Sequence, residues 1–165
     1  MDDNVRDLLT DPGMKLQVHQ AFSAGCFNSC WTLIDKGERS EEEDEEMVLL
    51  AEASLWHWKQ RTDCLPLNLS IGYWLASRVH ALAGHCDMAR EHADRCLRIS
   101  LDEDLPPFYK GYAYEALARS ESLSEEEGET RRFLKKARRE LAKVKDRQER
   151  EMLEADIASL EGSVS

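Results

Sequence analysis

Apolar residues recur every three or four positions along nearly the whole chain, and no segment alternates between apolar and polar residues. The first spacing gathers apolar side chains on one face of an α-helix, whereas alternation with period two is typical of a half-buried strand. The pattern therefore predicts an all-α protein with about seven helices. The first helix runs from about Met14 to Lys36, after Asp11 as its cap and Pro12 in its first turn, and Gly37 ends it.

Residues that start and stop helices divide the rest of the chain. Ser40 and Glu43 form a predicted capping box for a second helix, which continues to about Arg61. The acidic run 41–46 lies in its first turns, where the positive end of the helix dipole favours carboxylates. The other helices are predicted from proline, glycine and cap residues: after Pro66; after Gly84 with Asp87 as cap; after Pro107; from Ser124, with Glu127 in a second capping box, to about Val144; and from Asp146 to Leu160.

Taken in order, these helices pair into three antiparallel hairpins, and the last helix covers the apolar face that the third hairpin leaves open. A chain of 165 residues with 42% hydrophobic residues is long enough for one core but short for two. We therefore expect a single domain over residues 1–165, with flexible ends at about 1–12 and 162–165.

The segment between Leu67 and Leu101 resembles one tetratricopeptide repeat, a helical hairpin of about 34 residues. Small and aromatic residues recur in it at helical spacing on both sides of the turn at Gly84: Tyr73, Ala76, Ser77, His80, Ala89, Ala93 and Cys96. The resemblance implies stacked hairpins whose first helices line a concave groove.

A wider resemblance implies the same fold. Four stretches look like a family of uncharacterised, all-helical bacterial proteins: ASLWHWKQRT at 53–62, GYWLASRVHAL at 72–82, AREHADRCL at 89–97 and AYEALAR at 113–119. This resemblance covers most of residues 20–160. Because that family carries no established activity, the resemblance implies a fold and no reaction.

Composition narrows the class of partner and the compartment. The formal charge of −11 argues against a general affinity for nucleic acid or an anionic membrane, since both attract basic surfaces. Apolar runs such as 47–51 are far shorter than the roughly 20 residues of a membrane span. The acidic start does not resemble a secretory signal, and five irregularly spaced cysteines indicate reduced thiols. We expect a cytoplasmic protein without a membrane segment.

No motif of a metalloprotease, nucleotide-binding loop or serine hydrolase occurs. His92 and Cys96, four residues apart, would supply half of a zinc site, with His80, His85 or Cys86 to complete it. The same spacing is what helix packing requires, and a small buried thiol suits the position of Cys96. The sequence therefore predicts no catalytic residue, no metal and no cofactor.

The candidate binding residues lie on the helices that the resemblance places along the groove. Trp74 and Arg78 are one turn apart in the second hairpin, Glu115 and Arg119 occupy matching places in the third, and Tyr112 is near them. An arginine beside a tryptophan can hold a carboxylate while the indole covers an apolar group. The alternative is structural, with Trp74 in the core and Arg78 paired with Glu115. Three further candidates come from the first hairpin: Asn28, Trp31 and His57.

The leading functional hypothesis is a non-enzymatic scaffold that binds a protein or peptide through this groove, or forms a homo-oligomer through an outer face. A second hypothesis is a small helical enzyme in which His57, His80 or His92 acts with Glu115 in acid–base catalysis. A third is nucleic-acid binding through residues 131–150, which hold ten of the 22 basic residues and include a stripe spaced by four: Arg131, Lys135, Arg139 and Lys143.

Overall fold

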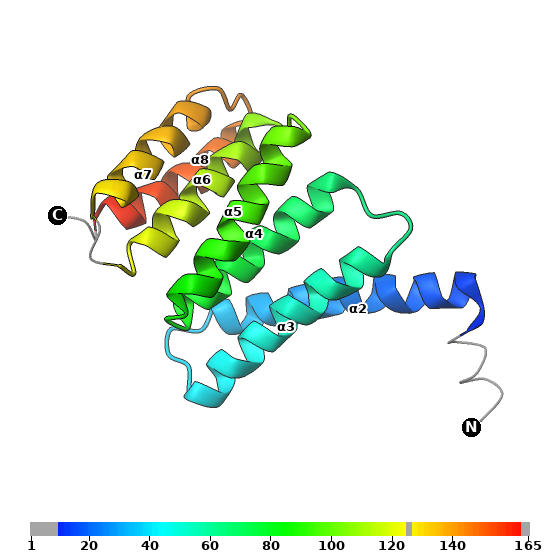
Figure 1. Ribbon diagram of the computed structural model, residues 1–165. Coiled ribbons are helices and arrows are strands. Elements are labelled where there is room, and N and C mark those ends of the chain that lie inside the picture. Colours follow the sequence, from blue (N-terminus) through cyan, green and yellow to red (C-terminus); the bar gives the residue numbers. More distant parts are fainter. Residues whose placement is uncertain (1–9, 125–126, 163–165) are drawn as a thin grey trace.

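The computed structural model describes residues 10–124 and 127–162, and the side chain of Glu127 lies outside that description. Every regular element in the described part is a helix (Figure 1). In chain order they are α2 (Pro12–Ile34), α3 (Glu41–Gln60), α4 (Pro66–Leu82), α5 (Cys86–Asp102), α6 (Pro107–Glu121), α7 (Glu127–Leu141) and α8 (Arg147–Glu161). The predicted all-α class with seven helices is confirmed.

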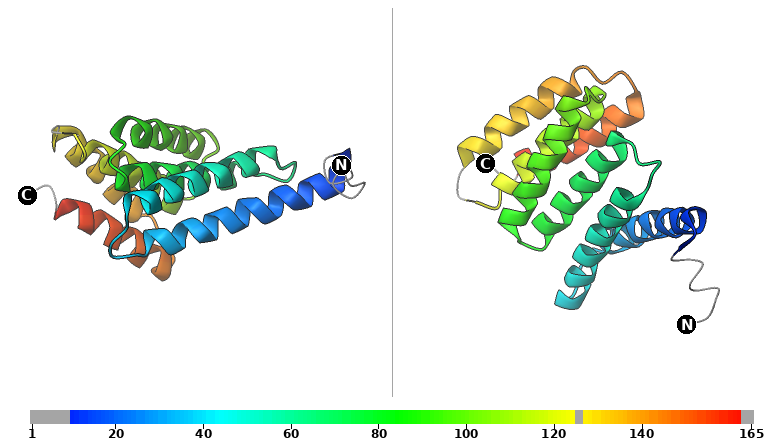
Figure 2. Two further views of the ribbon diagram at one scale, coloured as in Figure 1. Left: turned by 90° about the horizontal axis from the view of Figure 1, so that it is seen from below. Right: turned by 45° about the vertical axis from the view of Figure 1, so that its right-hand side comes forward.

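The helices pack as the predicted stack of hairpins. Helices α2 and α3, α4 and α5, and α6 and α7 form the three closest pairs, and α3 packs on α4 as α5 packs on α6. Figure 2 shows α2 and α8 toward one side of the molecule and α3 and α5 toward the other. Helix α8 contacts both α6 and α7, which is the place expected for a helix that covers the end of a stack.

Cap residues explain where most helices begin. Asp11 accepts a hydrogen bond from the Met14 backbone N–H at 2.7 Å. Ser40 accepts from the Glu43 N–H at 3.3 Å while the Glu43 carboxylate accepts from the Ser40 N–H at 3.1 Å, which confirms the first capping box. Asp146 likewise caps α8 by accepting from the Glu149 N–H at 2.9 Å.

Two predicted helix ends differ from the structure. Helix α5 begins at Cys86 with His85 at the cap position, so the prediction of Asp87 as cap was wrong. Asp87 lies instead in the first turn, where its charge meets the positive end of the helix dipole. Helix α7 ends at Leu141, about one turn before the predicted Val144, and a tighter turn follows in which the Val144 N–H donates to the Leu141 carbonyl at 3.1 Å. The second capping box needs the Glu127 side chain and so falls outside the described residues.

Helix α4 ends as the glycine in its turn predicts. Gly84 has φ of 77°, a left-handed conformation that glycine adopts without steric cost. The His85 N–H then donates to the His80 carbonyl at 2.8 Å, which satisfies a carbonyl of the last turn. This closure turns the chain sharply and brings α5 back along α4.

The core consists of three clusters along the stack. One lies between α2, α3 and α4, one at the centre around Leu55, Tyr73 and Cys96, and one between α6, α7 and α8. Trp74 is partly buried and packs against all three clusters. In residues 10–124 and 127–162, none of the helices has the length and apolar character that a membrane span requires.

Candidate binding site

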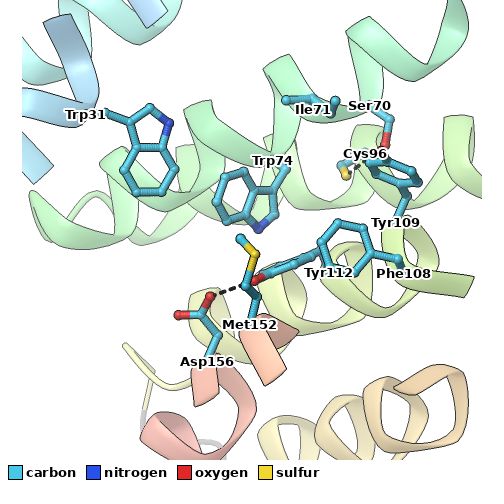
Figure 3. A pocket seen from close by; sticks show the side chains of 10 residues that line it. All are labelled: Trp31, Ser70, Ile71, Trp74, Cys96, Phe108, Tyr109, Tyr112, Met152 and Asp156. Atoms are coloured by element: carbon cyan, nitrogen blue, oxygen red, sulfur yellow. Dashed lines mark hydrogen bonds between the residues drawn. The ribbon is translucent and has the colours of Figure 1, made fainter. Parts of the chain in front are cut away.

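A pocket of about 290 Å³ opens on the face formed by the first helices of the hairpins and by α8 (Figure 3). Its lining is mainly apolar and comes from five helices: Trp31 of α2; Ser70, Ile71 and Trp74 of α4; Cys96 of α5; Phe108, Tyr109 and Tyr112 of α6; and Met152 and Asp156 of α8. Helices that are distant in the sequence therefore build one site.

A row of aromatic rings forms the wall of the pocket. Trp31 and Trp74 are stacked with ring centroids 6.0 Å apart, and Trp74 meets Tyr112 edge to face at 5.1 Å. Phe108 continues the row with a second edge-to-face contact to Tyr112 at 5.0 Å. These rings keep part of their surface exposed, unlike the aliphatic residues of the core behind them. Partly exposed aromatic rings held by such contacts are suited to cover an apolar group of a partner.

Asp156 is the one carboxylate in the pocket lining. It accepts a hydrogen bond from the Tyr112 hydroxyl at 3.0 Å and another from Arg78 at 3.1 Å. Burial, followed by the nearby charge of Asp156, raises the pKa of Tyr112 above its usual range, so the phenol keeps its proton. The hydroxyl and the carboxylate thus hold α6 and α8 together at the rim of the pocket.

Behind Trp74 lies a compact cluster of charges. Glu115 is 1% exposed and accepts from the Trp74 indole N–H at 3.2 Å and from Arg119 at 2.5 and 2.8 Å. Arg78 lies 3.9 Å from Glu115, in addition to its hydrogen bond with Asp156. Two arginines and two carboxylates balance one another, so the cluster supports the pocket without adding net charge to it.

At the opposite end of the pocket, Ser70 and Cys96 contribute small polar groups. The Ser70 hydroxyl lies 3.5 Å from the Cys96 sulfur and 2.8 Å from the Ser100 hydroxyl. Burial raises the pKa of the Cys96 thiol to about 11. A thiol that stays protonated at neutral pH is a poor nucleophile, and Cys96 acts here as a small packing group.

The structure brings together most of the residues that the sequence singled out. Five of them form one connected group across α4 and α6, and Trp31 joins them through its stacking on Trp74: Trp74, Arg78, Tyr112, Glu115 and Arg119. Asn28 is exposed on α2 and, with Trp58, lines a different pocket of about 230 Å³. His57 lies between α2 and α3, with its Nδ1 atom 2.8 Å from that of His19, and does not line the aromatic pocket.

Sequence reasoning missed several residues of the pocket. Phe108 and Tyr109 follow the proline pair at the start of α6, and Met152 and Asp156 lie one turn apart on α8. The last helix was interpreted only as a cover. Asp156 directly precedes Ile157, a buried residue of the apolar stripe of α8. This position was the signal in the sequence that α8 also contributes a polar group.

The structure also gives the surroundings of the residues on which the two alternative functions, an enzyme and a nucleic-acid-binding protein, are based. His80 and His92 meet on neighbouring helices, but their shared carboxylate is Glu52 rather than Glu115. Several basic side chains on α7 and just after it are paired with acids. On the helix, Arg132 donates to Glu129 at 2.9 Å and Arg138 to Glu161 at 2.6 Å, and beyond its end Lys143 donates to Glu140 at 2.6 Å.

Comparisons with known protein families, with curated proteins and with solved structures find no match to this chain.

Proposed function

We propose that this protein is a non-enzymatic scaffold that binds a protein or peptide partner by taking an apolar side chain of that partner into the aromatic pocket. The observation that carries the proposal is the pocket itself, in which partly exposed rings from α2, α4 and α6 surround a space of about 290 Å³. Pockets for complete small-molecule ligands have volumes of roughly 300–1,000 Å³. A space at the lower limit suits one anchoring side chain better than a whole cofactor.

The chemistry of the lining supports an apolar anchor. Aromatic and methionine side chains are enriched at the centres of protein interfaces, where a few of them supply most of the binding energy. Arg78 donates to Asp156 and Arg119 donates to Glu115, so each arginine already has an acidic partner within the chain. The Asp156 carboxylate and the oxygen of the Tyr112 hydroxyl at the rim can each accept a hydrogen bond from a backbone N–H of the segment that carries the anchor.

The proposal also includes a tetratricopeptide-like fold and a location in a reducing compartment. A stack of the tetratricopeptide kind presents its first helices to a partner, and the pocket lies on that face. All five cysteines have free thiols, which supports a reducing compartment such as the cytoplasm.

A peptide-display selection on the purified protein tests the proposal, followed by calorimetry with the selected peptides. We expect enriched peptides to share an apolar residue, and Tyr109→Ala to weaken their binding by about tenfold or more, the effect of losing one interface anchor. Leu49→Ala is the matched control because Leu49 is 69% exposed on α3 and lies outside the pocket. The proposal is wrong if no peptide is enriched, or if both variants bind the selected peptides as tightly as the wild type.

A further inference from the structure

A second group of side chains lies outside the aromatic pocket, where α3, α4 and α5 meet. Glu52 of α3, His80 of α4 and His92 of α5 each direct one ligand-type atom into a space where these atoms all lie within 4.8 Å of one another. One oxygen of Glu52, Oε1, lies 3.1 Å from His80 Nε2 and 2.7 Å from His92 Nε2. Three helices of two hairpins therefore converge on one carboxylate oxygen.

The two histidines are deeply buried, and His92 lacks hydrogen-bond partners. Both imidazoles are 6% exposed and are stacked with ring centroids 5.3 Å apart and an angle of 15°. Nδ1 of His92 has no hydrogen-bond partner, and Nε2 lies 2.7 Å from the Glu52 carboxylate without the alignment of a hydrogen bond. A buried imidazole with no hydrogen bond is unusual, since buried polar groups in folded proteins nearly always have a partner.

His80 has the environment of a metal-binding histidine. Its Nε2 faces Glu52, and its Nδ1 lies 3.2 Å from Nδ1 of His85 in the turn after α4. Histidines that bind metals commonly use one ring nitrogen as ligand while the other is held by a hydrogen bond that fixes the ring. His85 would provide that second contact. Because it contacts Nδ1 of His80, on the opposite side of the ring from Glu52, His85 is not one of the ligands.

We propose that Glu52, His80 and His92 form a binding site for a divalent transition-metal ion, with His85 as a positioning residue. Two imidazole nitrogens and one carboxylate are a ligand set that suits zinc and its neighbours, whereas calcium and magnesium prefer oxygen ligands alone. Zinc bonds of about 2.0–2.1 Å in a tetrahedron place the ligand atoms about 3.3 Å apart. Glu52 Oε1 lies 3.1 Å from His80 Nε2 and 2.7 Å from His92 Nε2, and all three ligand atoms lie within 4.8 Å of one another, so small movements of the three side chains would admit the ion.

The ligand set leaves one position of a four-coordinate ion open. Glu52 keeps 39% of its side chain exposed, so that position faces solvent and would hold water. Cys96 lies one turn further along α5 and is not part of this group, since its sulfur contacts the Ser70 hydroxyl at 3.5 Å instead. The site is independent of the proposed partner-binding function because none of its three ligands lines the aromatic pocket.

Zinc titration of the full chain, purified without a histidine tag and freed of metal, tests the site. We expect one zinc ion per chain by calorimetry, and visible absorption bands of four-coordinate cobalt when cobalt replaces zinc. Glu52→Gln should weaken zinc binding by about tenfold or more, His92→Asn should abolish it, and His85→Ala should weaken it by about 10–100-fold, the usual effect of removing a second contact.

His57→Asn is the matched control, because it removes a histidine that also lies close to another histidine but outside this group. It should bind zinc as the wild type does. If His92→Asn does not fold by circular dichroism, Glu52→Gln decides the question, since its side chain is partly exposed. The proposal is overturned if the wild type binds no zinc, if Glu52→Gln binds it equally well, or if His57→Asn abolishes binding.

Discussion

Glu115 shows how a single buried charge organises the site. Its carboxylate is sealed from water, yet it accepts hydrogen bonds from an indole on α4 and from Arg119 one turn further along α6. An unpaired buried charge is very unfavourable, so this arrangement is stable only while its partners remain in place. The aromatic wall of the pocket is fixed through Trp74 by the same contacts.

Substitution of Glu115 should therefore lower stability sharply. Glu115→Ala leaves Arg119 and the Trp74 N–H without their acceptor, and we expect a loss of about 3–5 kcal/mol in the free energy of unfolding, the cost of breaking a buried ion pair. Glu115→Gln keeps an oxygen acceptor and should cost clearly less. Urea unfolding of the two variants measures the difference, and equal losses below about 1 kcal/mol would show that the cluster is not structural.

Tyr112 predicts a pH dependence in the alkaline range. Its pKa in the folded chain is raised above the ordinary value of 10.0, first by burial and then by Asp156. Above about pH 10 the unfolded chain releases the phenolic proton while the folded chain keeps it, so the free energy of unfolding falls as pH rises. Below that pH the contribution of Tyr112 is fully present.

Comparison of the wild type with Tyr112→Phe isolates this contribution. Unfolding should be measured in steps from about pH 8 to pH 11. The variant should lose less stability than the wild type over the upper part of that range, because it has no phenol to ionise. Parallel curves would contradict the assigned environment of Tyr112.

At the scale of the helices, sequence signals predicted the elements but not all of their ends. Proline, serine and aspartate at helix starts and glycine at Gly84 act through local geometry, so they can be read without knowing the fold. The end of α5 was harder to predict, because Asp104 adopts φ of 46°, where glycine is expected. The Leu105 N–H still closes that turn on the Ser100 carbonyl at 3.0 Å.

Close packing of α6 against α8 depends on a glycine. A Cβ atom added at Gly111 would overlap Cδ2 of Leu153, which is fully buried and has no room to move. We expect Gly111→Ala to destabilise the protein by up to about 2 kcal/mol, since an overpacking cost of about 1–3 kcal/mol exceeds the gain of about 1 kcal/mol in helix propensity.

Gly25→Ala is the control for this effect. Gly25 lies within α2, and an added Cβ there would meet nothing within 4 Å. This variant should gain stability from helix propensity, by up to about 1 kcal/mol. Thermal and urea unfolding of both variants provide the test, and a stabilised Gly111→Ala would mean that α8 is not held as closely as the structure indicates.

At the scale of the whole molecule, the pocket exists only because the hairpins stack. Repeat-like spacing in the sequence predicts Trp74, Tyr112 and Trp31 on one side of the stack. Met152 and Asp156 could not be assigned in the same way, because the direction in which α8 folds back onto α6 depends on contacts between distant segments. His80 and His92 were named as possible zinc ligands from the sequence, but Glu52 was missed for the same reason, since the three residues come from three different helices.

The most direct test of the proposed binding site uses the tryptophans themselves. Of the four in the chain, Trp31 and Trp74 line the aromatic pocket, while Trp56 is exposed on α3 beside His19 and His57. Indole N–H signals in ¹H–¹⁵N spectra should be followed while a peptide from the display selection is added. We expect the Trp31 and Trp74 signals to shift with saturation and the Trp56 signal to stay in place. Binding that leaves Trp31 and Trp74 unchanged would contradict the assignment of this pocket as the partner site.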